Sequence, residues 1–346
     1  MRRVGTAALP PVALGATLTA TPALAHGVRP LGIENRTAAA CHFDVPPGTY
    51  DVTVRLGGET ASSTGVTGET RRSLLPETAV PAGEHPTRSF TVNVRTPEGE
   101  PTGPDGTAGL DLTIGGSDPA LAGIRVTPSR HARRIILIGD STVCDQPADP
   151  YSGRGRQLPR YLPRGLSVAN YADSGESTVT YLANPQFRAT VRPLVRPGDL
   201  VLVQLAHNDK ITDEATYRAN LETLVAGIRD KGGEPVLVTP VVRRWFNADG
   251  TLDNNTALLV NGLGVDLPAV VRSVAAAGHV PLIDLTAKTK ALVESLGPEG
   301  SKAIYLYNEK RDTTHTSESG ATVYAGLVRD ALLALHLVPE GAVRVG

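Results

Sequence analysis

Short apolar runs alternate with amphipathic stretches from residue 134 onward, and this alternation restricts the possible folds of the chain more than any other feature. The runs cover residues 135–138, 166–170, 200–205, 235–239 and 280–284, and the amphipathic stretches lie near 214–231, 266–277, 286–296 and 319–336. Strands that are apolar along their whole length are buried on both faces, and helical crossovers make neighbouring strands parallel. The sequence therefore predicts an α/β domain with a parallel sheet covered on both faces.

A hydroxyl residue follows the first apolar run at once. The run Ile135–Ile138 is followed by Gly139, Asp140 and Ser141. The carboxyl ends of parallel strands are where α/β enzymes bind their ligands. A serine hydroxyl barely ionises at neutral pH, so it acts as a nucleophile only beside a base, a group that orients the base, and donors for the oxyanion. Ser141 is the candidate nucleophile; the alternative is a serine that caps a helix.

A base and its orienting group lie near the far end of the chain. Asp312 and His315 are three residues apart, so one turn can present both side chains. The carboxylate can then hold the imidazole tautomer while the other ring nitrogen faces Ser141. The alternatives are a surface histidine and an aspartate that caps the following helix. The motif Gly-x-Ser-x-Gly is absent, which argues against the nucleophile elbow of α/β-hydrolases.

Candidate oxyanion donors lie between the nucleophile and the base. Gly175 stands within residues 173–177, and Asn208 follows the third apolar run. Glycine presents its backbone N–H without steric obstruction, and an asparagine amide donates from its side chain. With the backbone N–H of Ser141 they form the predicted oxyanion hole. The alternatives are a plain turn glycine and an asparagine that bonds only to backbone.

These blocks resemble the SGNH (GDSL-type) hydrolases, and in finer detail the bacterial rhamnogalacturonan acetylesterases of carbohydrate esterase family twelve. The matching segments are GDSTVCDQ at 139–146, SGES at 174–177, HNDK at 207–210, VLVTPVVRR at 236–244, VPLIDL at 280–285 and DTTHTSESGA at 312–321. The resemblance covers roughly residues 133–336. It implies a flavodoxin-like three-layer α/β/α sandwich and a Ser141–His315–Asp312 triad. Relatives usually carry Gly where this chain has Ala206, and a Trp-Gly-Gln-Met segment where it reads RGRQL at 154–158.

The first 25 residues have the pattern of a secretory signal peptide. A basic start, Met1 to Arg3, precedes an apolar stretch to about Leu18, and Ala23 to Ala25 form an A-x-A cleavage site. The stretch is broken by prolines and is short for a membrane span. We expect cleavage after Ala25, a secreted protein and no membrane partner.

Residues 38–130 are expected to form a separate small β-sandwich of galactose-binding-like type. Period-two patterns cover 49–55, 88–95 and 109–114, with Gly and Pro clusters between them. Residues 128–131 read as a linker, and the catalytic domain is expected over 131–340. The sandwich packs against the catalytic domain, forms one wall of the cleft or binds sugar independently. The two cysteines after the signal segment, Cys41 and Cys144, are either bridged between the domains or separate thiols.

Charge and histidine patterns exclude some classes of partner. The formal net charge is −1 with acids and bases interspersed, which argues against nucleic acid. No two histidines stand at metal-ligand spacing, so we expect no metal and no cofactor. We also expect a monomer.

Two arginines follow the fourth apolar run and can reach the same edge of the sheet as Ser141. Arg243 and Arg244 are candidates for binding a substrate carboxylate, which guanidinium groups grip bidentately; structural ion pairing is the alternative. The resemblance implies a secreted serine esterase that deacetylates plant cell-wall polysaccharide, with rhamnogalacturonan (pectin) as substrate. The alternatives are an esterase or lipase for another acyl ester, such as acetylated xylan, and a non-catalytic carbohydrate-binding protein.

Overall fold

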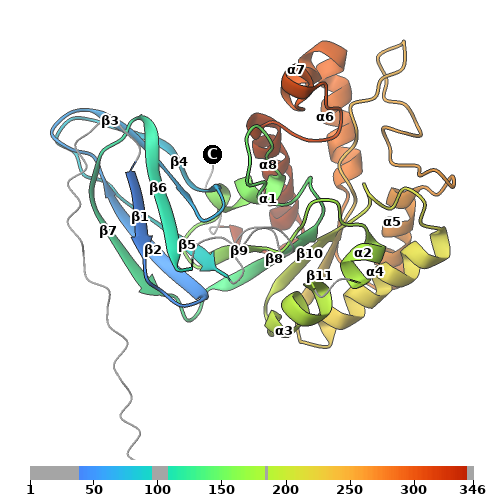
Figure 1. Ribbon diagram of the computed structural model, residues 1–346, viewed down its shortest axis with the longest axis horizontal. Coiled ribbons are helices and arrows are strands. Elements are labelled where there is room, and N and C mark those ends of the chain that lie inside the picture. Colours follow the sequence, from blue (N-terminus) through green and yellow to red (C-terminus); the bar gives the residue numbers. More distant parts are fainter. Residues whose placement is uncertain (1–38, 96–107, 184–185, 341–346) are drawn as a thin grey trace, which may run out of the picture.

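The computed structural model describes residues 39–95, 108–183 and 186–340. The predicted signal segment, residues 1–25, lies outside these ranges. The chain forms an antiparallel β-sandwich followed by a parallel α/β unit, which lie side by side (Figure 1). Strand β7 (Leu121–Pro128) ends the first unit and β8 (Arg133–Gly139) begins the second. The predicted linker at 128–131 therefore overlaps the end of β7 by one residue.

Two antiparallel sheets enclose one core in the first unit. One sheet has the order β1 (Ala39–Phe43), β6 (Leu110–Asp118), β3 (Ser62–Gly68) and β4 (Arg72–Val80); the other has β5 (Thr87–Val94), β2 (Gly48–Leu56) and β7. Both sheets contribute to the core, for example Val52 and Phe90 from one and Leu112 from the other. The sequence predicted β2, β5 and β6. It missed β3 because its Ser, Thr and Gly residues carry no clear apolar period.

The second unit contains the predicted parallel sheet. Its order is β12 (Leu282–Ile283), β11 (Glu234–Val238), β10 (Leu200–Gln204), β8 and β9 (Leu166–Asn170), and every pairing is parallel. The chain order reverses between β8 and β10, and the carboxyl ends of the strands at such a reversal are where open α/β sheets bind ligands. The α/β class and its five predicted strands are confirmed.

Helices cover both faces of this sheet (Figure 1). Ile136 and Ile138 of β8 pack with α4 (Glu214–Arg229) and α5 (Leu267–Ala277). Their neighbours Ile135 and Leu137 pack toward α6 (Leu285–Gly300) and α8 (Glu318–Ala334). This alternation explains why the strands are apolar throughout. The shorter helices are α1 (Arg154–Gln157), α2 (Thr178–Ala183), η2 (Gln186–Val191), α3 (Arg192–Leu194) and α7 (Tyr307–Lys310), with 3-10 turns η1 (Leu158–Tyr161) and η3 (Ser301–Ala303).

A buried ion cluster joins the two units. The carboxylate of Asp145, four residues after Ser141, has one oxygen 3.0 Å from Arg72 Nε and 3.5 Å from Arg95 Nη2. The other oxygen accepts a hydrogen bond from Asn170 Nδ2 at 2.7 Å. Both arginines belong to the sandwich, and all three charged side chains are at most 2% exposed. The sandwich is therefore anchored directly to the loop that follows the candidate nucleophile.

The two cysteines are not bridged. Cys41 lies on β1, whereas buried Cys144 lies beneath the nucleophile turn with its Sγ 3.4 Å from Ser174 Oγ. The alternative of two separate thiols is thus the one observed. Within the described ranges, no helix is both long and apolar enough to cross a membrane.

Candidate active site

The structure brings Ser141, His315 and Asp312 into one hydrogen-bonded chain. Ser141 Oγ lies 2.9 Å from His315 Nε2, and His315 Nδ1 lies 2.7 Å from the Asp312 carboxylate. Ser141 stands in the turn after β8, and the other two lie in the loop between α7 and α8. Helix α8 is capped by Ser317, so Asp312 does not have the capping role that the sequence left open. The arrangement has the connectivity of a serine–histidine–aspartate triad.

Hydrogen bonds keep Asp312 ionised. Partial burial raises the pKa of the carboxyl. Hydrogen bonds from the His315 ring and from the backbone N–H groups of His315 and Thr314 lower it by more, so the pKa is about 2. The two N–H groups donate to Oδ1 at 2.9 and 2.7 Å, which leaves Oδ2 to receive the imidazole. The carboxylate therefore fixes the ring with its proton on Nδ1 and leaves Nε2 to accept the serine proton.

A second buried carboxylate shapes the turn that carries Ser141. Asp140 Oδ1 accepts hydrogen bonds from the backbone N–H and the hydroxyl of Thr142, at 2.9 and 2.7 Å, and Oδ2 lies 3.1 Å from His207 Nδ1. Burial raises the pKa of Asp140, yet the charge and hydrogen bond of His207 and the two Thr142 donors lower it to about 2. Ser141 lies in a turn and does not begin a helix, so the helix-cap alternative is wrong.

The two predicted oxyanion segments lie against each other. Asn208 Nδ2 donates to the carbonyl of Glu176 at 3.1 Å, and Asp209 accepts from the backbone N–H and the hydroxyl of Thr178. These bonds fix the loop of Gly175, whose φ is 84°. A side chain at this φ would be strained, which explains the glycine. An asparagine amide has two N–H donors, so one remains for a ligand oxygen.

Ala206, the position where relatives usually carry glycine, adopts no positive φ. The alanine therefore introduces no backbone strain beside Asn208.

The two candidate substrate arginines differ. Arg243 donates from Nη2 to the carbonyl of His207 at 3.0 Å and lines a small hollow of about 100 Å³ with His207 and Asn261. Its Nε is buried without a hydrogen-bond partner, and its burial lowers the pKa while the charges of Asp140 and Asp312 raise it.

Arg244 is directed into the protein. Its guanidinium bonds Ser301 Oγ and the carbonyl of Pro298, and lies 4.0 Å from the Tyr307 ring centroid. The structure thus brings Arg243, but not Arg244, to the hollow lined by His207. The contacts of Arg244 fit the structural alternative.

The sequence did not reveal that the sandwich reaches the triad. Arg71, in the turn between β3 and β4, donates from Nη1 to the carbonyls of Gln146 and Tyr151, at 2.9 and 3.4 Å. It also pairs with Asp149, and its own carbonyl accepts from Arg156 Nε at 2.7 Å. One arginine therefore holds both ends of the loop 146–151.

Each end of that loop touches a triad residue. The Gln146 amide donates to the carbonyl of Ser141 at 2.7 Å. The Tyr151 ring stands at 88° to the His315 ring, with 5.4 Å between centroids. Arg71 is far from Ser141 and His315 in sequence, so its role could be recognised only from the fold. Gln146 could have been recognised from the sequence, because it ends the block GDSTVCDQ.

Comparisons with known proteins agree with this site. Residues 137–337 match the GDSL-like Lipase/Acylhydrolase family. The chain is 34% identical to the rhamnogalacturonan acetylesterase RhgT of Bacillus subtilis over 220 residues, which covers 59% of this chain and 91% of RhgT. It is 31% identical to the probable rhamnogalacturonan acetylesterase YesY of the same organism, covering 60% of this chain and 95% of YesY.

A solved structure extends the similarity in fold to more of the chain. The crystal structure of YxiM from Bacillus subtilis is 24% identical, with a TM-score of 0.55, and covers 85% of this chain and 80% of that chain. RhgT and YesY, by contrast, match over about three fifths of this chain and over more than nine tenths of their own length.

The triad geometry predicts the reactivity of Ser141 toward a serine-directed fluorophosphonate. Replacing Asp312 with Asn keeps the shape but removes the charge that fixes the imidazole, so labelling should slow by about 10³-fold or more. The labelling rate can be followed by intact-protein mass spectrometry. Asp330→Asn, an exposed change on α8, is the control and should label at the wild-type rate. An Asp312→Asn protein that labels as fast as this control would contradict the assignment.

The contacts of Arg71 predict that the sandwich supports the triad. In Arg71→Ala the loop 146–151 loses its anchor, and small displacements of reacting groups cost about 10–10² in rate. We expect this loss in the labelling rate of folded protein, as judged by circular dichroism. Arg88→Ala, an exposed arginine on β5, should have no effect. Equal rates for the two variants would show that the contact is only structural.

Proposed function

The chain belongs to the GDSL-like lipase/acylhydrolase family, and we propose that within it the protein is a secreted serine esterase that deacetylates plant cell-wall polysaccharide, with rhamnogalacturonan as substrate. As a member of this family it is a hydrolase of carboxylic esters. The observation that carries the proposal is the Ser141–His315–Asp312 chain at the carboxyl edge of the sheet.

The geometry supports an acyl-transfer mechanism in two halves. Ser141 Oγ attacks the ester carbonyl while His315 Nε2 takes its proton, and the Asp312 carboxylate stabilises the imidazolium. The proton then passes to the leaving sugar hydroxyl as the C–O bond breaks, which leaves an acyl-Ser141. A water molecule repeats the attack with His315 as base, and acetate departs while Ser141 regains its proton.

The oxyanion of each tetrahedral intermediate is assigned three donors. These are the backbone N–H groups of Ser141 and Gly175 and the side-chain amide of Asn208. One such donor contributes roughly 3 kcal/mol of transition-state stabilisation. The bond from Asn208 to the Glu176 carbonyl supports this role, because it holds the amide beside the Gly175 loop before substrate arrives.

The polysaccharide substrate is supported by the relatives and by one side chain. RhgT and YesY are named as rhamnogalacturonan acetylesterases. Arg243 lines the hollow together with His207, and its buried Nε has no hydrogen-bond partner. A guanidinium in this position suits the carboxylate of a galacturonate residue. The signal-like segment at 1–25 supports secretion, and a secreted enzyme reaches a polymer that lies outside the cell.

Acetate release tests the substrate. The protein should release acetate from acetylated rhamnogalacturonan, and Ser141→Ala should release none above background, because no other group replaces the nucleophile. Acetylated xylan is the comparison substrate. Release from xylan alone would keep the mechanism but overturn the substrate. No release from either polymer by folded protein would favour another ester or a non-catalytic binding role.

The role of Arg243 predicts a charge-dependent effect. In Arg243→Ala, KM for an acetylated oligogalacturonide should rise about tenfold, since a charge-assisted hydrogen bond is lost. KM for a neutral acetylated xylo-oligosaccharide should stay the same, which controls for general damage to the site. Equal changes for both substrates would show that Arg243 serves the fold and not the carboxylate.

A further inference from the structure

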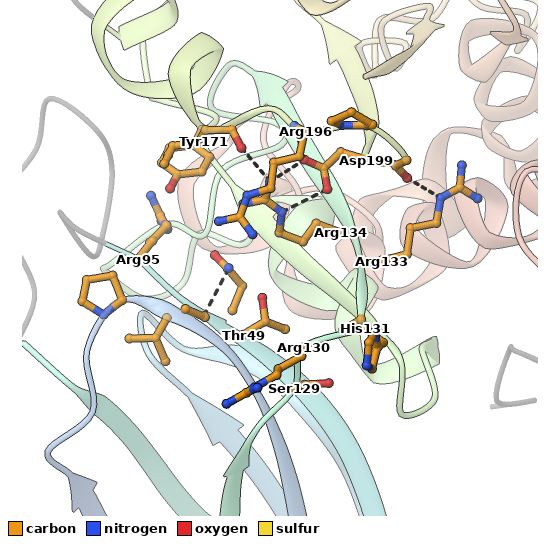
Figure 2. Close-up of a pocket in the computed structure, with 18 of the residues that line it drawn as sticks. Thr49, Arg95, Ser129, Arg130, His131, Arg133, Arg134, Tyr171, Arg196 and Asp199 are labelled. Carbon is orange, nitrogen blue, oxygen red and sulfur yellow. Dashed lines mark hydrogen bonds and ion pairs between the residues drawn. The ribbon is translucent and has the colours of Figure 1, made fainter. Parts of the chain in front are cut away.

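A large cleft separates the sandwich from the parallel sheet. It has a volume of about 1060 Å³, and Figure 2 shows side chains meeting in it from both units. Thr49, Ser129 and Arg130 form the wall on the sandwich side, and Arg134 and Arg196 stand opposite. Its size is at the upper end for ligand sites in proteins, large enough for more than one sugar residue.

The lining of the cleft carries more positive than negative side chains, although the whole chain has a net charge of −1. Its lining contains five arginines and one histidine against two carboxylates. Arg134 forms an ion pair with Asp199, with Nε 3.0 Å from Oδ1, and Arg133 forms one with Glu234, with Nη2 2.8 Å from Oε2. A concave surface of one charge sign attracts ligands of the opposite sign.

Two of the arginines are available to a ligand. Arg130 and Arg196 are both exposed, and neither forms an ion pair within the described residues. His131, also exposed, stands beside Arg130 in the linker between the units. The hydroxyls of Thr49 and Ser129 add neutral hydrogen-bonding groups to the same wall.

The part of the cleft that carries Arg130 and Arg196 lies at the opposite edge of the sheet from the triad, whereas another part reaches Tyr171, which follows β9. Arg133 begins β8 and Glu234 begins β11, whereas Ser141 follows the end of β8. The seven extended residues of β8 separate its two ends by roughly 20 Å. No residue of the triad lines the cleft. A ligand bound here would therefore not meet the reacting serine.

We propose that this cleft is a second carbohydrate site, which binds the carboxylates of a uronate-bearing polysaccharide through Arg130 and Arg196. The inference rests on the proposed function for the identity of the ligand. Arginine forks match carboxylates bidentately, and hydroxyls suit sugar. Apart from His131, the lining residues include one aromatic side chain, Tyr171, which is only 4% exposed. The cleft therefore offers little aromatic surface on which a neutral sugar could stack. The cleft holds the polymer while another part of it reaches the triad.

Binding of a deacetylated oligogalacturonide tests the site. The full chain is first blocked at Ser141 with a fluorophosphonate, which occupies the triad and leaves the cleft open. Isothermal titration calorimetry at low salt should then detect binding. In the double variant Arg130→Ala/Arg196→Ala binding should weaken at least about tenfold, because two charge-assisted contacts are lost. Arg125→Ala, an exposed arginine of β7 outside the cleft, should bind like the blocked wild type.

The ligand chemistry has its own control. A carboxyl-reduced oligogalacturonide has the same sugars without the charges and should not bind. Equal binding of the reduced oligomer or of duplex DNA would overturn the assignment, as would a double variant that binds like Arg125→Ala. The double variant should also hydrolyse a small acetyl ester at the wild-type rate. Failure of the proposed function would give a different result. The unblocked protein would release no acetate from acetylated rhamnogalacturonan, yet it would still bind the oligogalacturonide through the two arginines.

Discussion

The buried carboxylate of Asp145 is the constraint on which the relation between the two units depends. A charge removed from water must be compensated, and Asp145 lies against Arg72 and Arg95 of the sandwich and accepts from the amide of Asn170 in the catalytic unit. Removing one partner of such a cluster costs about 3–5 kcal/mol. Because Asp145 follows Ser141 so closely, the same cluster that joins the units also fixes the loop behind the nucleophile, and Arg71, next to Arg72, extends this support to the rim of the site.

Two carboxylates with depressed pKa values organise the chemistry. In Asp140 and Asp312 hydrogen-bond donors outweigh the effect of burial, and both pKa values fall from 3.8 to about 2. Asp140 shapes the turn that presents Ser141, and Asp312 orients His315. A depressed pKa favours the folded state above the unfolded value of 3.8, and this contribution is lost as the pH falls through about 2. Both groups therefore remain ionised throughout the range in which an imidazole can act as a base.

The catalytic unit was predictable from sequence because its signals are local. Buried parallel strands leave uninterrupted apolar runs, and Ser141, Gly175 and Asn208 each follow one. The sandwich was only partly predictable, since β3 consists of Ser, Thr and Gly and shows no apolar period. Contacts between distant segments left no signal: nothing in the sequence links Arg71 to Tyr151, or Arg130 to Arg196. The segment RGRQL also takes part in such a contact, because Arg156 donates to the carbonyl of Arg71 in the sandwich.

The triad assignment makes Ser141 the nucleophile, which His315 and Asp312 activate. Peptide mapping of the protein after stoichiometric inactivation by a fluorophosphonate tests this most directly. We expect one covalent adduct, on Ser141, that forms in step with the loss of ester hydrolysis. An adduct on another residue, or full ester hydrolysis by protein phosphonylated at Ser141, would contradict it.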